Sequence, residues 1–177
     1  MIAMIRERLH EYDVRVFRSV ARMERPGKRL RFWRLLSRSG DGPLYIVAAL
    51  VLSFRSQTQS AFLIAGLITF ALELPLYKLL KGVFRRQRPF VKLSDAVRHI
   101  VPPDEFSFPS GHAAGAVVVA AIISAFLPVA GLIACLYACL VGYSRVALGV
   151  HYPGDVLAGA ILGLCCSCMG LSGAGVL

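Results

Sequence analysis

The chain has 177 residues, of which 56% are hydrophobic and only 17% charged, and its mean hydropathy is +0.65. Soluble domains are less apolar and carry about 25% charged residues, so the composition excludes an ordinary soluble protein and favours a polytopic membrane protein. The net charge is +10, and 11 of the 20 Lys and Arg precede residue 43. Anionic lipid headgroups or phosphorylated substrates explain this charge better than nucleic acid, which we do not expect in so apolar a chain.

The N-terminal 42 residues have the pattern of basic amphipathic helices. In residues 5–23, apolar positions such as Leu9, Tyr12 and Val16 recur at steps of three or four, and arginines occupy other positions. Pro26 and Gly27 interrupt the pattern, and a second basic segment, 28–38, carries Trp33 and several leucines. We expect two interfacial helices with their apolar faces in the acyl boundary and their arginines at anionic headgroups. A solvated basic tail would leave Trp33 and the leucines in water.

The rest of the chain predicts about five membrane spans. They cover residues 44–54 with their polar flanks, 61–80, 112–126, 128–142 and 155–171, and a tight break falls at Leu127–Pro128. We therefore expect an all-α polytopic bundle. It forms one domain over 1–177, with an interfacial segment at 1–42 and a catalytic bundle at 43–177. No cleavable signal peptide is expected, because the first forty residues are too charged.

Two kinds of residue inside these spans have a structural interpretation. The five cysteines lie in apolar runs and lack a partner set at zinc spacing, so we interpret them as small packing residues. Glu73 is either a buried hydrogen-bonding group or part of a pocket wall.

Five spans place the N-terminal segment, the 81–110 connection and the 144–155 segment on one side of the membrane. Each of the two connections carries polar residues at the edge of an apolar run, where ionisable groups usually have a function. The polar clusters can therefore converge on one site.

The first two clusters have the features of an anion site. Lys81 and Arg88 are seven residues apart, which on a helix places both on one face, and together they suit phosphate. Alone, this stretch also fits lipid-headgroup anchoring. Ser110 is a good helix N-cap, Gly111 permits close backbone approach, and free N–H groups at a helix start bind anions. His112 can then exchange a proton near neutral pH.

The third cluster supplies a second histidine and a carboxylate. Pro153 and Gly154 fit a helix start, which places Asp155 in the first turn. There its carboxylate can accept one N–H of His151, leaving the other ring nitrogen free to attack phosphorus. Arg145 adds a third cation. Two histidines and three cations suffice for phosphoryl transfer without a metal. A metal site of His112, His151 and Asp155 is the alternative, but the cations would repel the ion.

The three clusters read Lys-x6-Arg-Pro, Pro-Ser-Gly-His and Ser-Arg-x5-His-x3-Asp. In this order they resemble the signature of the type 2 phosphatidic acid phosphatase superfamily, which includes lipid phosphatases, bacterial acid phosphatases and vanadium haloperoxidases. The resemblance covers residues 81–155. It implies a phosphohistidine on His151 oriented by Asp155, with His112 as general acid and no metal or other cofactor. The phosphate-holding residues would be Lys81, Arg88, Arg145, Ser110 and the Gly111 amide.

The resemblance predicts a phosphatase acting on a membrane lipid phosphate or diphosphate. Phosphatidic acid, phosphatidylglycerophosphate and polyprenyl phosphates or diphosphates are candidates, and no protein partner is indicated. The spans argue against a soluble haloperoxidase. A protein that binds or flips lipid phosphates without turnover is the alternative.

The charge distribution predicts the orientation of the site. On five spans, 19 of the 20 Lys and Arg lie on the side of the clusters, with Arg55 opposite. The positive-inside rule then places the site at the cytoplasmic leaflet of the inner (plasma) membrane, although many membrane members of the superfamily carry it outside the cytoplasm.

Overall fold

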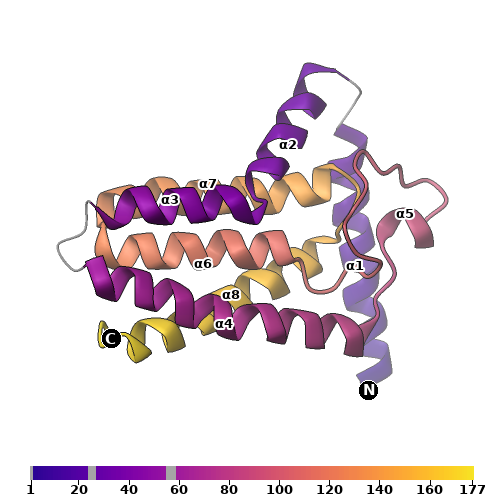
Figure 1. The fold of residues 1–177 in the computed structure, drawn as a ribbon. Helices are drawn as coiled ribbons and strands as arrows, with labels where there is room; N and C mark the ends of the chain where they lie inside the picture. The colour runs from indigo at the N-terminus through magenta and orange to yellow at the C-terminus, as the bar shows by residue number, and fades with distance from the viewer. Residues whose placement is uncertain (1, 24–26, 55–58) are drawn as a thin grey trace.

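In the computed structural model, which describes residues 2–23, 27–54 and 59–177, all regular secondary structure is α-helical (Figure 1). The expected all-α fold is therefore confirmed. The eight helices in these ranges are α1 (Ile2–Met23), α2 (Lys28–Ser39), α3 (Gly42–Ser53), α4 (Gln59–Phe84), α5 (Pro89–Lys92), α6 (Gly111–Phe126), α7 (Pro128–Ala147) and α8 (Pro153–Gly173). Pro26 and residues 55–58 lie outside the described ranges, so the breaks expected there are not described.

Two helices continue beyond the apolar runs that predicted them. α4 extends past residue 80 and ends before Arg85, whose φ of 43° lies in the left-handed region that non-glycine residues rarely adopt. α7 extends past residue 142, so that Arg145 lies in its last turn. Lys and Arg are good helix formers, so a change from apolar to basic residues does not end a helix. The break between α6 and α7 at Leu127–Pro128 is confirmed.

Helix α6 is the centre of the bundle and packs against α4, α7 and α8. Its contact with α8 is close because both helices present small residues. A Cβ at Gly159 of α8 would stand 2.3 Å from the Ser110 carbonyl oxygen, and one at Gly163 would stand 2.5 Å from that of Ala114. Small residues at such positions let helix backbones approach closely in membranes. The starts of α6 and α8, which carry two of the polar clusters, are thereby held together.

The apolar helices differ in whether they are long enough to cross a bilayer. In the described part of the chain, three helical segments pass on length and composition: Ser60–Lys92, α7 and α8. Helices α2 and α3 pass only as one span bent by 63°, which gives up to four. Helix α6 has 16 residues, or about 24 Å at 1.5 Å per residue, against a hydrocarbon core of about 30 Å. The count of five spans stays a prediction.

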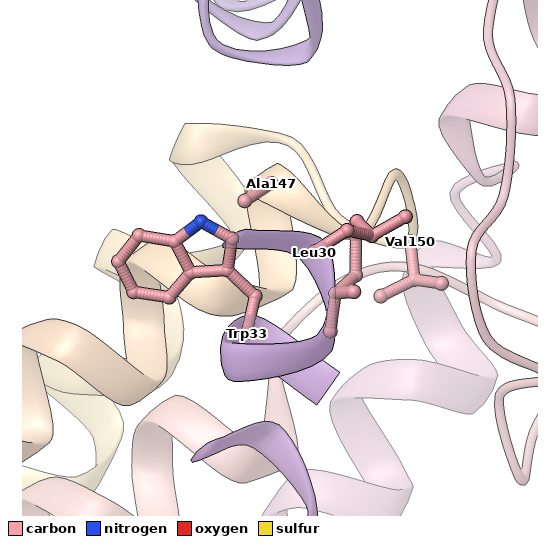
Figure 2. Close-up of a cluster of buried hydrophobic side chains, with 5 residues drawn as sticks. Leu30, Trp33, Ala147 and Val150 are labelled. Carbon is pink, nitrogen blue, oxygen red and sulfur yellow. The ribbon is translucent and has the colours of Figure 1, made fainter. Parts of the chain in front are cut away.

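Helix α2 packs against the rest of the protein with one face, and its outer face also carries apolar residues. Its Leu30 and Trp33 are buried against Ala147, Leu148 and Val150, at the end of α7 and in the turn after it (Figure 2). The expectation that Trp33 lies in the acyl boundary is therefore wrong. The helical period identifies an apolar face but does not say whether protein or lipid covers it.

Helix α1 crosses the end of the bundle at a steep angle to the long helices (Figure 1). Phe17 is buried against Val146 and Tyr152, whereas Leu9 and Tyr12 are exposed. The expected amphipathic helix is present, but part of its inner surface is a docking surface on the bundle.

Candidate active site

The polar clusters meet at the end of the bundle where α4 and α7 finish and α6 and α8 begin (Figure 1). Backbone contacts join them directly. The Ser110 N–H donates to the Asp155 carbonyl at 2.9 Å, and the Ser107 N–H donates to the Arg86 carbonyl at 2.8 Å. The expected convergence of the clusters is present in the structure.

His151 lies between α7 and α8, and its side chain is buried. Its Nδ1–H donates to the Ser107 carbonyl at 2.7 Å, and Nε2 lies 3.3 Å from Nη1 of Arg88. Burial lowers the pKa of His151, the charges of Arg145 and Arg88 add to this effect, and Asp155 only partly opposes it, giving a pKa of about 3. The imidazole is therefore neutral at physiological pH, with its lone pair on Nε2 toward Arg88.

Asp155 lies in the first turn of α8, as expected, and is fully buried. Its Oδ2 accepts the Tyr152 N–H at 2.8 Å, and its Oδ1 pairs with Nη1 of Arg86 at 2.6 Å. Oδ2 lies 3.8 Å from Nδ1 of His151, beyond hydrogen-bond distance. The expectation that Asp155 accepts the imidazole N–H is thus wrong, because its oxygens are occupied and the Ser107 carbonyl is nearer. Asp155 acts on His151 through its charge and by fixing the start of α8.

Lys81 and Arg88 do not share a helix face, because α4 ends at Phe84 and Arg88 lies in extended backbone before α5. They are joined by Asp104, from the 93–110 connection. Lys81 Nζ pairs with Oδ2 of Asp104 at 2.6 Å, and Nη2 of Arg88 pairs with Oδ1. Burial raises the pKa of Asp104, but hydrogen bonds from Lys81 and Tyr77 outweigh it and hold the pKa at about 2. A carboxylate therefore occupies the two cations predicted to hold phosphate.

The start of α6 has the predicted geometry. The Ser110 side chain caps the helix by accepting the Ala113 N–H at 3.4 Å. A Cβ at Gly111 would stand 2.9 Å from the Tyr77 ring, so only glycine fits there. His112 follows in the first turn, and its Nε2 lies 2.9 Å from Oδ1 of Asp41, between α2 and α3.

Arg145 is buried, and its Nη1 donates to the Ser37 hydroxyl of α2. Its Nε–H has no hydrogen-bond partner among the described residues, which is rare for a buried donor. Arg145 and His112 line a cavity of about 440 Å³ whose wall also includes Arg34, Arg38 and Asp41. An acceptor with several oxygens in this cavity would satisfy the free donor.

A second cavity, about 700 Å³, lies among α6, α7 and α8 and is almost wholly apolar. It contains none of the predicted site residues, whereas His112 and Arg145 line the smaller, polar cavity. Glu73 is buried in α4 and lines neither cavity, which favours its structural interpretation. In the described ranges, no three His, Cys, Asp or Glu side chains are grouped as metal ligands.

Comparison with known proteins identifies the family. The model of the PAP2 superfamily matches residues 59–173, which span α4 to α8. This chain belongs to the PAP2 superfamily. It is 35% identical over 133 residues to an undecaprenyl-diphosphatase of Sulfolobus acidocaldarius; the alignment covers 72% of this chain and 62% of the relative. The chain thus spans less than two thirds of the length of that relative.

Two solved structures share the fold. LpxE of Aquifex aeolicus superposes with a TM-score of 0.78 at 30% identity, covering 90% of this chain and 94% of LpxE. A transmembrane PAP2-type phosphatidylglycerolphosphate phosphatase of Bacillus subtilis superposes with a TM-score of 0.72 at 27% identity, covering 93% and 85%. The PAP2 fold of a membrane helical bundle is thereby shown for this chain.

Several residues of the candidate site in this PAP2 protein were not predicted from the sequence. Asp104, Asp41 and Ser37 each contact a predicted residue, and the Ser107 carbonyl accepts from the imidazole. Asp104 and Asp41 are acidic residues in a basic chain, a signal that could have found them. A backbone carbonyl has no sequence signal.

Proposed function

We propose that this PAP2 protein is a lipid phosphatase that transfers the terminal phosphate of a membrane lipid to Nε2 of His151 and then to water. One observation carries the proposal. His151 is neutral, its proton is held on Nδ1 by the Ser107 carbonyl, and its unprotonated Nε2 accepts a hydrogen bond at 3.3 Å from Nη1 of Arg88, a guanidinium suited to phosphate. A nucleophile and the group that positions its target are thus adjacent.

The reaction has two steps with a common site. In the first, Nε2 of His151 forms a bond to phosphorus, the bond to the lipid oxygen breaks, and His112 donates a proton to that oxygen. In the second, His112 takes a proton from water, the water oxygen forms a bond to phosphorus, the bond between phosphorus and Nε2 of His151 breaks, and inorganic phosphate leaves. Lys81, Arg88 and Arg145 offset the charge on the phosphate oxygens in both transition states. Neither step requires a metal or other cofactor.

The site must open for substrate, because His151 is 2% exposed and Asp104 holds both Lys81 and Arg88. Asp104 is 29% exposed and lies on an irregular connection, so it can leave. We infer that the substrate phosphate replaces the Asp104 carboxylate, with its oxygens on the same two cations. The phosphate carries two negative charges and the carboxylate one, so charge favours the phosphate as the partner of the two cations.

The substrate is a lipid carrying a phosphate or diphosphate at its headgroup. The names of the relatives include an undecaprenyl-diphosphatase and a phosphatidylglycerolphosphate phosphatase. Phosphatidic acid, phosphatidylglycerophosphate and polyprenyl phosphates or diphosphates form the test panel. The cations contact phosphate only, so residues outside the phosphate site would select among the lipids.

The decisive experiment measures phosphate release from this panel by the purified protein in detergent. We expect release that resists EDTA, is inhibited by orthovanadate and disappears in His151→Ala. His99→Ala is the control, because His99 lies outside the proposed phosphate site. Phosphate release that persists in His151→Ala would refute the nucleophile, and release lost with EDTA would support a metal. Specific lipid binding without release would support the alternative of a binding or flipping protein.

We also propose that the site faces the cytoplasmic leaflet. The basic residues support this orientation through the positive-inside rule. Single cysteines at position 57 and at position 97, each in a background without the five native cysteines, test it in intact cells. An impermeant reagent should label position 57 alone, and labelling of position 97 would place the site on the outer side.

A further inference from the structure

Asp13, near the middle of α1, reaches the start of the catalytic helix α8. It is 7% exposed, and its Oδ1 accepts the Gly154 N–H at 2.6 Å. A Cβ at Gly154 would stand 2.7 Å from the Asp13 carboxylate, so the contact depends on glycine. This N–H is one of those that a helix start leaves without an internal partner. Asp13 therefore caps α8 from a helix about 140 positions away in the sequence.

The second oxygen of Asp13 connects to Asp155 through one arginine. Nη2 of Arg86 pairs with Oδ2 of Asp13 at 2.6 Å, and Nη1 pairs with Oδ1 of Asp155, also at 2.6 Å. The guanidinium lies 4.2 Å from the centre of the Tyr152 ring, which is fully buried. Arg86 is thus held in place by two carboxylates and an aromatic face.

The same ring connects α1 to the site by apolar contacts. Phe17 and His10, both from α1, pack edge-on against Tyr152 with ring centres 5.7 Å away. Tyr152 is the residue between His151 and the start of α8, and its N–H donates to Asp155. Three side chains of α1 therefore contact the segment that carries the proposed nucleophile.

We propose that Asp13 is a positioning residue for catalysis, which makes α1 part of the active-site structure as well as a surface helix. Asp13 acts through Arg86 and Gly154 on Asp155 and His151 and does not touch the substrate. The proposal rests on the function proposed above. It concerns a residue outside the 59–173 region that the family model matches.

The charges explain why Asp13 has this effect. Arg86 lies between two carboxylates, so neutralising Asp13 leaves it with the carboxylate of Asp155 and the weaker contact of Nη2 with Nδ1 of His10 at 3.3 Å. The guanidinium then shifts toward Asp155 or toward water, because its side chain is 24% exposed. Either shift moves the carboxylate that fixes the α8 start and acts on His151. Displacements of about 1 Å near reacting groups reduce rates by up to about 10²-fold.

The experiment compares Asp13→Asn with the wild type in detergent micelles, where no bilayer has to be bound. Asn keeps an oxygen for the Gly154 N–H and removes the charge that holds Arg86. We expect kcat to fall about tenfold, with KM and the inhibition constant of orthovanadate within about twofold of wild type. Unchanged vanadate inhibition shows that the variant is folded and that its phosphate site is intact. Asp13→Glu should recover part of kcat.

The matched control replaces Leu9 and Tyr12 by serine on the exposed surface of α1. This variant should keep the wild-type kcat in micelles. If it loses as much activity as Asp13→Asn, α1 acts as a surface helix only and the proposal is overturned.

A double-mutant cycle provides a readout that a general structural role would not change. In an Arg86→Gln background, Asp13→Asn should cause no further loss of kcat, because its effect passes through the arginine. Additive losses, or a wild-type kcat in Asp13→Asn, would overturn the positioning role. Failure of the wild type to release phosphate from any lipid would refute the proposed function instead, so the two failures are distinguishable.

Discussion

Neutralising Asp104 should strengthen the binding of phosphate to this protein. The Asp104 carboxylate pairs with Lys81 and Arg88, and phosphate has to displace it to reach either cation. Asp104→Asn removes the competing charge and leaves an amide of nearly the same shape. We therefore expect a lower inhibition constant for inorganic phosphate and a lower KM for a lipid phosphate.

The size of the effect follows from the pairing. The pKa of Asp104 falls from 3.8 to about 2, and one pKa unit corresponds to about 1.4 kcal/mol, so the full shift amounts to about 2 kcal/mol. The side chain is 29% exposed, and solvent screening reduces the value of such pairs to about 1 kcal/mol. That energy corresponds to about a fivefold change in binding.

The assay measures competitive inhibition of lipid hydrolysis by inorganic phosphate in detergent at low salt. Glu105→Gln is the matched control, because it removes the same charge from an exposed neighbour on the same connection. Asp104→Asn should bind phosphate about fivefold more tightly, and Glu105→Gln should resemble wild type. An unchanged or weaker phosphate affinity in Asp104→Asn would refute the displacement and indicate that Asp104 organises the cations for binding.

Three further predictions test the site and the packing around it. The pKa of His151 is about 3 in the folded protein against an ordinary 6.5, so between these pH values the unfolded chain binds more protons than the folded one. The unfolding free energy should therefore fall as pH falls through this window. ¹⁵N NMR should show a neutral ring at pH 5, and an imidazolium signal at that pH would contradict the prediction. Gly159→Ala places a Cβ 2.3 Å from the Ser110 carbonyl and should destabilise the fold by about 1–3 kcal/mol in thermal unfolding, whereas Gly82→Ala, with nothing within 4 Å, should not. Trp33→Ala should lower the unfolding free energy by about 3–5 kcal/mol. Trp33→Phe should lower it much less, because the indole N–H has no hydrogen bond among the described residues. Equal losses in the two variants would show that the N–H contributes to stability.

The apolar runs predicted the helices of the bundle. They did not predict features that depend on contacts with other parts of the chain. Arg145 lies in the last turn of α7, and its guanidinium reaches the Ser37 hydroxyl inside the protein. The sequence shows a basic residue after an apolar run. It does not show that a hydrogen-bond acceptor from α2 lies close to that residue in the fold. Trp33 was assigned to lipid for the same reason, since only the fold places the end of α7 against it.

The sequence predicted that the polar clusters converge, but it did not identify the partners of their side chains. Lys81 and Arg88 were placed on one helix face, whereas the chain leaves the helix at Arg85 and Asp104 joins the two cations instead. Asp155 was paired with His151, yet the imidazole donates to the Ser107 carbonyl. Each correction replaces a local partner by one brought from another part of the chain.

The sequence by itself determined the family of the chain and that its polar clusters share one end of the bundle. Ionisable residues at the edges of apolar runs are costly, so their positions are informative. Only the tertiary structure decided which groups hold Asp155 and His151 in place: Asp13 from α1, Arg86 beyond α4 and the Ser107 carbonyl. Hydrogen bonds and ion pairs act over about 3 Å of space regardless of separation along the chain, and a backbone carbonyl is the same in every residue. The ordinary basic-amphipathic pattern of α1 therefore contained no sign of the contacts it makes with the segment that carries the proposed nucleophile.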